Sequence, residues 1–378
     1  MGLTSHKVLL LAAVLTVALV AATLWIWPRL AVRSWPALFA RLGTVLVTQL
    51  ALVCTLGLLA NDYFAFYASW GDLLGTDQGG AVTLRTAPGA KPSGPSGPAV
   101  GVVPLPGDGV HGPAGSPAQV GRLDHVRLPG VVSGLSSDGY VYLPPQYFQP
   151  AYQQRSFPAV VVLTGFPGDA KNLVTKLDYP GTLLRELRAG TVAPSVQVLL
   201  RPSPSMPRDS ECEDVPGGPQ ARTYFATDVP KAIRASYRVQ AGPRSLAMIG
   251  DSTGGYCALK LALTSPETYP AAVSLSGYYK AAEDVTTGDL FGGSPQRRQE
   301  ADLSWRLTHL PQPAVSLLLA DSLEDGSTYA EAQAFAALAR PPLTVDQATV
   351  DSGGHNFTTW TRLIPTALQW LSARLTAP

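Results

Sequence analysis

The sequence predicts an α/β domain with a mostly parallel central sheet, preceded by two apolar helices long enough to cross a membrane. Two uncharged N-terminal runs indicate the helices, and a Gly/Pro-rich stretch separates them from the rest of the chain. From about residue 118, continuous apolar strands alternate with helical patterns, which is typical of a parallel sheet covered on both faces. About 260 residues of this kind suit a single domain.

The composition excludes several functional classes. Of 378 residues, 46% are hydrophobic and only 15% are charged, so the chain can bury a core and is not of the disordered class. The 28 basic and 27 acidic residues nearly cancel, which leaves no excess positive charge for binding nucleic acid. Three cysteines cannot build a disulfide scaffold, and the five histidines are scattered without metal-ligand spacing. We therefore expect neither a metal site nor a cofactor.

The first apolar run covers residues 8–27 without a charge, which matches the length needed to cross the hydrocarbon core of a bilayer. A cleaved signal peptide is the alternative for this run, but no A-x-A site is visible. A second uncharged run, residues 44–60, also argues against the signal peptide. We expect residues 1–75 to form a membrane hairpin that ends in an interfacial aromatic segment, with Tyr63, Phe64, Phe66, Tyr67 and Trp70.

The distribution of basic residues predicts the orientation of this hairpin. Arg29, Arg33 and Arg41 lie between the two runs, whereas only Lys7 and the α-amino group precede the first. By the positive-inside rule, the connecting loop is cytoplasmic and both ends of the hairpin lie outside. We therefore expect a protein of the cell membrane whose domain after residue 117 is extracytoplasmic.

Residues 76–117 differ in composition from both flanks, since eighteen of these 42 residues are Gly or Pro. Such a segment buries no core, and we expect it to be a linker. The domain that follows covers residues 118–378. Its expected strands are residues 123–128, 140–143, 159–163, 196–200, 246–249, 272–275, 315–320 and 343–350. Its expected helices are residues 170–187, 229–237, 255–264, 328–339 and 357–375.

The strongest motif lies where one of these strands meets a helix. The pentapeptide GDSTG, residues 250–254, has the form G-x-S-x-G, with an apolar strand before it and a helical pattern after it. Such a nucleophile elbow places its serine on a strained turn, which requires small residues two positions before and after it. The N–H of Thr253, at the start of the helix, is then free to bind an oxyanion. Ser252 is the predicted nucleophile.

A nucleophilic serine needs a base, and in this arrangement the chain order is serine, acid, histidine. Only His355 follows the last expected strand, and two glycines before it allow its loop to turn toward the serine. The acid is expected just after strand 315–320. Asp325 fits best because this acid usually lies a few residues past the strand end, and Glu324 ranks second and Asp321 third. Its role would be to hold His355 in the correct tautomer and to stabilise the imidazolium.

A second oxyanion donor is expected in the loop after strand 159–163, whose sequence is TGFPG. Gly165 permits a close approach of the backbone to the serine. Pro167 has no N–H, so the expected donor is the N–H of Phe166.

With these motifs the chain resembles the putative-esterase group of α/β-hydrolases, which includes esterase D-type enzymes and antigen-85-type mycolyltransferases. The resemblance extends over residues 119–378 and implies an acyl-enzyme on Ser252, His355 as the base, and Phe166 and Thr253 as oxyanion donors. Many actinobacterial members similarly carry an N-terminal membrane part. The segments that carry the resemblance are TGFPG (164–168), RDSECED (208–214), YFATDVP (224–230), GDSTGGYCALKLA (250–262) and GGHNFTTW (353–360).

The resemblance to the mycolyltransferases is incomplete at the positions that hold the sugar acceptor. Those enzymes carry Asp before the glycine of the oxyanion loop and Arg two residues after it, where this chain has Thr164 and Pro167. This difference favours hydrolysis, or transfer to another acceptor, over transfer to trehalose.

Two of the cysteines fall in the expected extracytoplasmic part, where disulfides persist. Cys257 lies five residues after Ser252 on the expected helix, and Cys212 lies in a long loop rich in acidic residues, Pro and Gly. We hypothesise a Cys212–Cys257 disulfide that fixes this loop beside the site. Two buried free thiols are the alternative.

Together these features predict a membrane-anchored, extracytoplasmic serine esterase that acts on a small-molecule or lipid-like ester. An acyltransferase that passes the acyl group to a cell-envelope alcohol would use the same acyl-enzyme, and a peptidase would use the same triad. A non-catalytic envelope-binding module is the alternative from another class. The complete set of Ser252, Asp325 and His355 argues against that last alternative, because a binding module has no need of all three.

Overall fold

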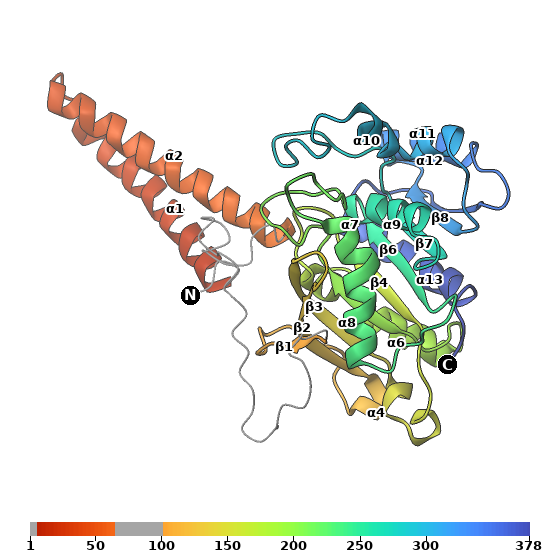
Figure 1. Ribbon diagram of the computed structural model, residues 1–378. Coiled ribbons are helices and arrows are strands. Elements are labelled where there is room, and N and C mark those ends of the chain that lie inside the picture. Colours follow the sequence, from red (N-terminus) through yellow and green to blue (C-terminus); the bar gives the residue numbers. More distant parts are fainter. Residues whose placement is uncertain (1–5, 65–100) are drawn as a thin grey trace. The chain divides into compact units, whose positions relative to one another are not determined.

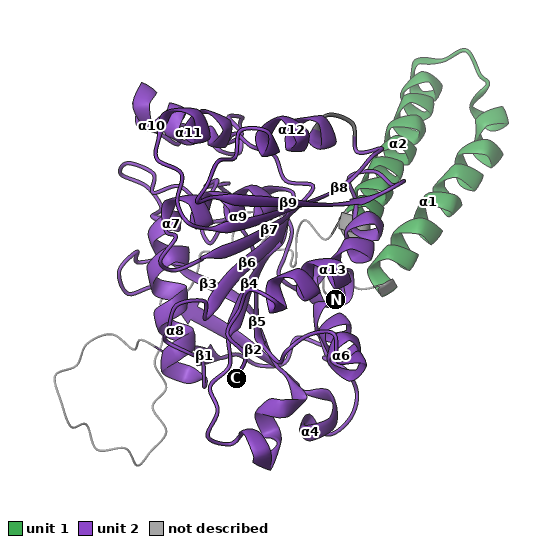
Figure 2. Cartoon of the chain, turned by 90° about the vertical axis from the view of Figure 1, so that its right-hand side faces the viewer, with its two compact units in different colours: residues 1–92 green, residues 93–378 purple. Residues whose placement is uncertain are grey.

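The computed structural model of the chain describes residues 6–64 and 101–378. They belong to two compact units, residues 1–92 and residues 93–378, which Figure 2 shows in different colours. The aromatic residues from position 65 onward and most of the expected linker lie outside the described residues.

The first unit is a pair of helices, α1 (His6–Ile26) and α2 (Trp35–Phe64), joined by a short segment that includes the turn η1 (Trp27–Leu30). Both helices are long and apolar enough to cross a membrane, by length and composition. Threonines join them: Thr16 Oγ1 lies 2.8 Å from Thr55 Oγ1, and Thr23 Oγ1 lies 2.9 Å from Thr48 Oγ1. On each helix the two threonines are seven residues apart, about two turns, so they face the partner helix together.

The second of these helices begins earlier than the apolar run indicated. The uncharged run starts at residue 44, but α2 starts at Trp35 and contains Arg41. A charge interrupts an apolar run without interrupting a helix, and here the Arg41 guanidinium donates back to the carbonyl oxygen of Leu30 and lies 5.8 Å from the ring of Trp27. The segment between the helices is therefore shorter than expected.

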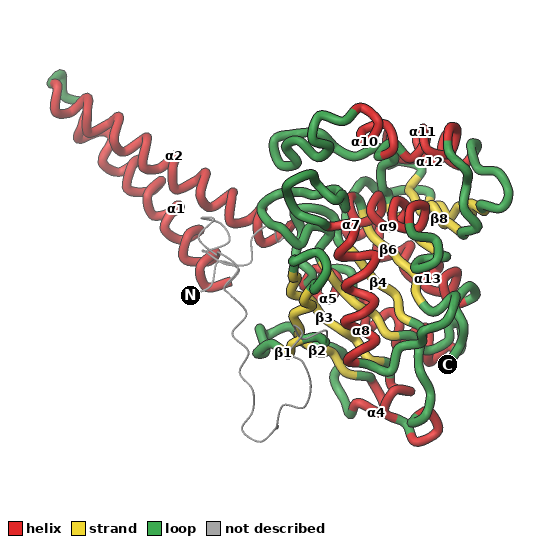
Figure 3. Tube along the Cα trace, in the orientation of Figure 1, coloured by secondary structure: helices red, strands yellow, loops and turns green. Residues whose placement is uncertain are grey.

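A nine-stranded sheet is the framework of the second unit within its described residues (Figures 1 and 3). The strand order is β1-β2-β3-β5-β4-β6-β7-β8-β9. The first three neighbouring pairs in this order are antiparallel, and every pair from β5 to β9 is parallel. This mixed, mostly parallel sheet confirms the expected fold class. The strands are β1 (Val103–Pro104), β2 (Arg122–Pro129), β3 (Ser136–Leu143), β4 (Ala159–Leu163), β5 (Val196–Leu200), β6 (Leu246–Asp251), β7 (Ala271–Leu275), β8 (Ser316–Ser322) and β9 (Thr344–Val350).

Helices cover both faces of this sheet (Figure 2). Two apolar cores lie between the sheet and these helices. The side chains of β4 alternate between them: Val161 packs in the core under α8 and α9, whereas Val160 and Val162 pack in the core under α6 and α13. The longer helices are α6 (Tyr179–Ala189), α8 (Val229–Ser236), α9 (Thr253–Thr264), α12 (Gly326–Ala336) and α13 (Phe357–Ser372). Shorter ones are α4 (Pro117–Val120), α5 (Lys171–Thr175), α7 (Ala221–Thr223), α10 (Pro295–Glu300) and α11 (Leu303–His309), with single turns at η2 (Pro145–Phe148), η3 (Pro150–Tyr152) and η4 (Tyr224–Asp228).

Two sequence expectations differ from the observed elements. The helix expected at 170–187 is divided into α5 and α6 by Asp178, which has a left-handed backbone (φ 47°) and caps α6 through the N–H of Gly181. The expected linker was to end at residue 117, but part of residues 101–117 is already attached to the folded domain, since β1 pairs with β2 and Val110 packs against a core. Their high Gly and Pro content masked the few apolar residues that attach them.

The turn between β6 and α9 is packed so closely that two positions accept only glycine. A Cβ added to Gly250 would lie 2.3 Å from backbone atoms of Gly254, and a Cβ added to Gly254 would lie 2.3 Å from the carbonyl oxygen of Leu163 in β4. The obstacles are backbone atoms, so no side-chain rotation relieves the clash. The first turn of α9 therefore rests directly on the end of β4.

We expect Gly254→Ala to destabilise the protein by about 3 kcal/mol, because the added methyl group forces α9 away from β4. Urea unfolding followed by circular dichroism measures this change. Gly242→Ala is the matched control, since no atom lies within 4 Å of its added Cβ, and it should change stability by no more than about 0.5 kcal/mol. Equal stability of the two variants would contradict the close packing at this turn.

Candidate active site

Ser252 lies at the turn between β6 and α9, with φ 52° and ψ −119°. Residues with a Cβ rarely adopt this backbone, which costs about 1–3 kcal/mol and persists only where packing enforces it. The glycine contacts of the turn enforce it here, and the N–H of Ser252 donates to the carbonyl oxygen of Leu275 at 3.0 Å. The serine is therefore held at the N-terminus of α9, at the carboxyl edge of the parallel strands.

His355 lies on the loop between β9 and α13, and its Nε2 is 2.9 Å from Ser252 Oγ. The ring packs edge-on against Trp360 in the first turn of α13, with ring centroids 5.0 Å apart. In the same loop Gly353 has φ +120°, a conformation that favours glycine. The imidazole side chain remains 42% exposed, so reactants from solvent can reach it.

Of the three candidate carboxylates, the structure brings Asp325 to the histidine. Its Oδ2 lies 3.2 Å from His355 Nδ1. With Nδ1–H donating to this carboxylate, Nε2 carries the lone pair that accepts the hydroxyl proton of Ser252. Glu324 instead accepts the N–H of Gly353 at 3.0 Å, so it ties the acid loop to the histidine loop.

Asp321, the third candidate, lies at the end of β8 and is buried away from the histidine. Burial, together with the nearby charge of Asp325, raises the pKa of this carboxyl to about 7. Asp325, which the sequence ranked first, thus has the contact that the acid role requires. Glu324 and Asp321 have other surroundings.

The two predicted oxyanion donors lie on different elements, one after β4 and one at the start of α9. The N–H of Phe166 follows β4, and the N–H of Thr253 opens α9; within the described part of the chain neither N–H has an acceptor. The contact of Gly254 with Leu163 holds α9 and the end of β4 together. Both N–H groups are thus available to a ligand near Ser252.

The loop that carries Phe166 is held by Asp251, the second residue of the GDSTG pentapeptide, whose role the sequence did not indicate. Asp251 is fully buried, and its Oδ2 accepts the N–H of Gly165 at 2.9 Å. Burial raises the pKa of Asp251 to about 7, while the hydrogen bond from Gly165 lowers it. Because Gly165 directly precedes Phe166, Asp251 is a positioning residue for the predicted oxyanion donor.

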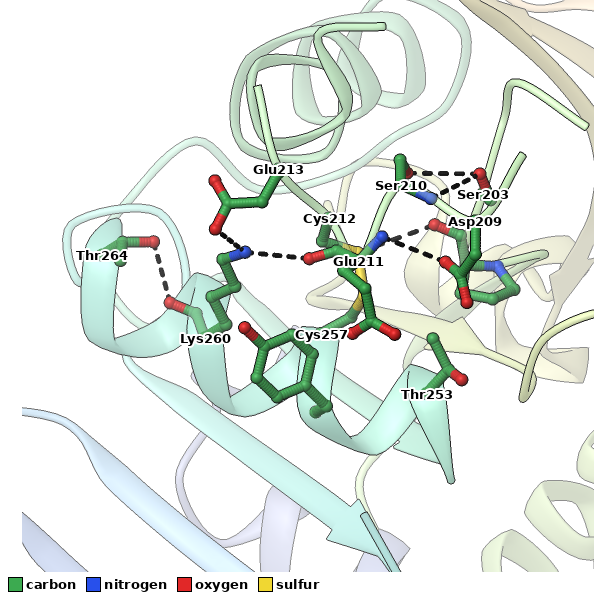
Figure 4. The surroundings of a disulfide bond; sticks show 12 residues. Ser203, Asp209, Ser210, Glu211, Cys212, Glu213, Thr253, Cys257, Lys260 and Thr264 are labelled. Atoms are coloured by element: carbon green, nitrogen blue, oxygen red, sulfur yellow. Dashed lines mark hydrogen bonds and ion pairs between the residues drawn. A yellow bond between two sulfur atoms is a disulfide. The ribbon is translucent and has the colours of Figure 1, made fainter. Parts of the chain in front are cut away.

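The structure joins Cys212 and Cys257 in a disulfide (Figure 4). This bond fastens the loop of residues 201–220 to α9. Lys260, about one turn beyond Cys257, donates to the carbonyl oxygen of Glu211 at 2.9 Å and pairs with the carboxylate of Glu213. The loop is therefore attached to α9 at two neighbouring places.

Two further polar residues near Thr253 had no assigned role in the sequence. The Glu211 side chain is fully buried, and its Oε1 accepts the hydroxyl of Tyr278 at 2.6 Å. The same hydroxyl lies 3.1 Å from Thr253 Oγ1. Glu211 belongs to the RDSECED segment of the resemblance, but nothing in the sequence singles out Tyr278, which follows β7 in a Tyr-Tyr pair.

The site brings together a hydroxyl, an imidazole, a carboxylate and two free N–H groups, which is the equipment for acyl transfer through a serine. Among the residues that the structure describes, no group of three or more His, Cys, Asp or Glu side chains is arranged to hold a metal ion.

A serine on a strand–turn–helix elbow, with the acid and the histidine after the last two parallel strands, defines the α/β-hydrolase fold. Solved structures agree. A ferulic acid esterase superposes with a TM-score of 0.58 at 16% identity, covering 68% of this chain and 99% of that one. An S-formylglutathione hydrolase from Agrobacterium tumefaciens gives 0.56 at 16% identity, with 68% and 97% covered. A fluorophosphonate-binding serine hydrolase of Staphylococcus aureus gives 0.53 at 16% identity, with 67% and 98% covered.

The sequence model of the family described as "Putative esterase" matches residues 135–371. The chain therefore belongs to this esterase family, as its resemblance implied. An uncharacterized protein of Corynebacterium glutamicum is 25% identical over 273 residues, which cover 68% of this chain and 63% of that protein. The chain thus matches less than two thirds of that relative's length.

Because Asp325 and Glu324 have different contacts, mutation of each can distinguish their roles. Asp325→Asn removes the charge that orients and stabilises the imidazolium, and we expect kcat on a short ester to fall by about 10³- to 10⁴-fold. Glu324→Gln can still accept the N–H of Gly353 through its amide oxygen, and we expect less than about a tenfold loss. Steady-state kinetics of the two variants checks this, and a loss in E324Q as large as that in D325N would refute the assignment.

Proposed function

We propose that the chain is a membrane-anchored, extracytoplasmic serine esterase that hydrolyses carboxylic esters through an acyl-enzyme. The observation that carries this proposal is the continuous chain of contacts from Asp325 through His355 to Ser252, at 3.2 Å and 2.9 Å. Membership of the esterase family supports the reaction class.

His355 Nε2 takes the hydroxyl proton of Ser252 as Oγ attacks the ester carbonyl carbon, and Asp325 stabilises the imidazolium that forms. The negative charge that develops on the carbonyl oxygen is held by the N–H groups of Phe166 and Thr253. The imidazolium then protonates the leaving alcohol, which gives an acyl-enzyme on Ser252. Water activated by His355 releases the acid and restores the serine.

The membrane part of the proposal rests on the first unit. Its two apolar helices pair through Thr16–Thr55 and Thr23–Thr48, which is how polar side chains join helices inside a bilayer. The arginines between the helices favour a cytoplasmic connection and an outside location for the hydrolase. The disulfide supports the same side, since disulfides persist in oxidising compartments outside the cytoplasm.

Ester hydrolysis is tested with the full chain in detergent, using p-nitrophenyl esters of increasing acyl length. We expect hydrolysis by the wild-type protein and a loss of at least about 10³-fold in Ser252→Ala. A fluorophosphonate probe should label the wild-type protein and leave S252A unlabelled. Labelling without hydrolysis of any ester would favour an acyltransferase, which product analysis with added alcohols would reveal, and absence of labelling would sink the enzyme mechanism.

The topology is tested on intact cells that produce the full chain with a C-terminal epitope tag. We expect external protease to remove the tag, because both ends of the hairpin lie outside. A cytoplasmic protein serves as the control for cell integrity. A tag that is protected in intact cells and cleaved only after lysis would place the hydrolase on the cytoplasmic side.

A further inference from the structure

A chain of hydrogen bonds that begins at a buried carboxyl group ends on Thr253, the residue that follows the predicted nucleophile. It runs from Glu211 Oε1 to the hydroxyl of Tyr278 at 2.6 Å and from this hydroxyl to Thr253 Oγ1 at 3.1 Å. Glu211 is fully buried, and within the described residues its second oxygen, Oε2, has no hydrogen-bond partner. Figure 4 shows Glu211 and Thr253 close together beside the disulfide.

Two contacts with α9 fix the backbone at Glu211 and Cys212. Glu211 and Cys212 have φ angles of 48° and 50°, which non-glycine residues seldom adopt. The disulfide to Cys257 and the bond from Lys260 to the carbonyl oxygen of Glu211 hold the two residues against α9. The backbone that carries the Glu211 carboxyl group is therefore held in place next to Tyr278.

The direction of the hydrogen bonds depends on the number of protons. A tyrosine hydroxyl has one hydrogen and cannot donate to both neighbours. When Glu211 is ionised, Tyr278 donates to it, and the Thr253 hydroxyl donates to Tyr278. When Glu211 is protonated, its proton resides on Oε1, since a hydrogen on Oε2 would be buried without an acceptor. Glu211 then donates to Tyr278, Tyr278 donates to Thr253, and the hydroxyl hydrogen of Thr253 is free for another acceptor.

We propose that Glu211 and Tyr278 are positioning residues that set the direction of the Thr253 hydroxyl, so that in the protonated state of Glu211 this hydroxyl donates to an oxygen of the reacting ester. The proposal rests on the proposed esterase function. Thr253 would then offer two donors to the transition state, its backbone N–H and its side-chain O–H. The proton that switches the chain comes from solvent, and no covalent bond changes.

The surroundings of Glu211 favour protonation near neutral pH. The pKa of Glu211 is raised to about 8, mainly by burial and in addition by the charge of Asp209. The bond from Tyr278, the charge of Lys260 and the nearby backbone N–H of Ala282 act in the opposite direction and limit this rise. The titratable groups that face this cluster are Asp209 and Glu213 from the loop, Tyr256 and Lys260 from α9, and Tyr278 after β7. Because the carboxyl loses its proton as the pH rises through about 8, the Thr253 donor is present below that pH and lost above it.

The test is the pH profile of ester hydrolysis between pH 6 and pH 10, followed by acid release in a pH-stat with the full chain in detergent. We expect kcat of the wild-type protein to fall roughly 3- to 10-fold with an apparent pKa near 8, with little change in KM, because a donor to the transition state is lost. Glu211→Gln stays neutral, and this alkaline limb should disappear. Tyr278→Phe interrupts the chain and should also abolish the limb. Thr253→Val keeps the N–H but has no hydroxyl, and should show the low alkaline rate throughout.

Tyr279→Phe is the matched control. Tyr279 neighbours Tyr278, is buried, and its hydroxyl has no hydrogen-bond partner among the described residues, so the limb should persist in Y279F. Thermal unfolding verifies that each variant is folded, and Y278F provides the same test should E211Q not fold. A limb that persists in E211Q or Y278F, or its absence from the wild-type protein, would overturn the proposal. Folded wild-type protein that hydrolyses no ester would instead reject the esterase function beneath it.

Discussion

The contact between the first turn of α9 and the end of β4 is the constraint on which the site depends. Gly254 lies against the carbonyl oxygen of Leu163, and Gly250 lies against Gly254, so helix and strand approach as closely as backbones allow. This approach accompanies the unusual backbone of Ser252 and places the start of α9, at Thr253, beside the end of β4. The predicted nucleophile and the N–H of Thr253 therefore share one packing contact, whereas the loop that carries Phe166 is held in addition by Asp251. The histidine and its acid then have only to reach this fixed point from the neighbouring strands.

Buried carboxyl groups form the support of this site, and burying them is costly unless they are paired or protonated. Asp251 has a backbone N–H as its partner, Glu211 has the hydroxyl of Tyr278, and Asp321 has no partner for Oδ1 among the described residues. The pKa of each is raised toward neutrality by burial. A raised pKa means that the folded state retains protons that the unfolded state has lost. These groups therefore contribute stability that is present below pH 4 and declines as the pH rises through about 7 and 8.

The features of this structure that depend on local sequence pattern could be predicted from the sequence. Apolar runs located the strands from β2 to β9, and the pentapeptide with its flanking elements indicated Ser252, because strand, turn and helix are contiguous there. His355 and Asp325 could be proposed from chain order alone, since the order of loops along a parallel sheet is fixed by its topology. Asp251, Glu211 and Tyr278 could not be assigned in this way. Their roles arise from burial and from contacts between segments far apart in the chain, and a carboxyl or hydroxyl group has the same appearance in sequence whether it is solvated or enclosed. The sequence also did not predict that β1 pairs with β2, because a strand of two residues leaves almost no apolar pattern.

The loop of residues 201–220 links the geometry of the site to the redox state of two cysteines. It holds two consecutive residues with left-handed backbone and a buried carboxyl, and each of these features opposes folding. The Cys212–Cys257 disulfide, one residue after Glu211, offsets part of that cost. The buried Lys260, about one turn beyond Cys257 on α9, offsets a further part through its bond to the carbonyl oxygen of Glu211. Since a disulfide of this kind persists only under oxidising conditions, the arrangement around Thr253 is complete only where such conditions hold. The same bond that stabilises the loop thereby couples the geometry around Thr253 to the redox state of Cys212 and Cys257.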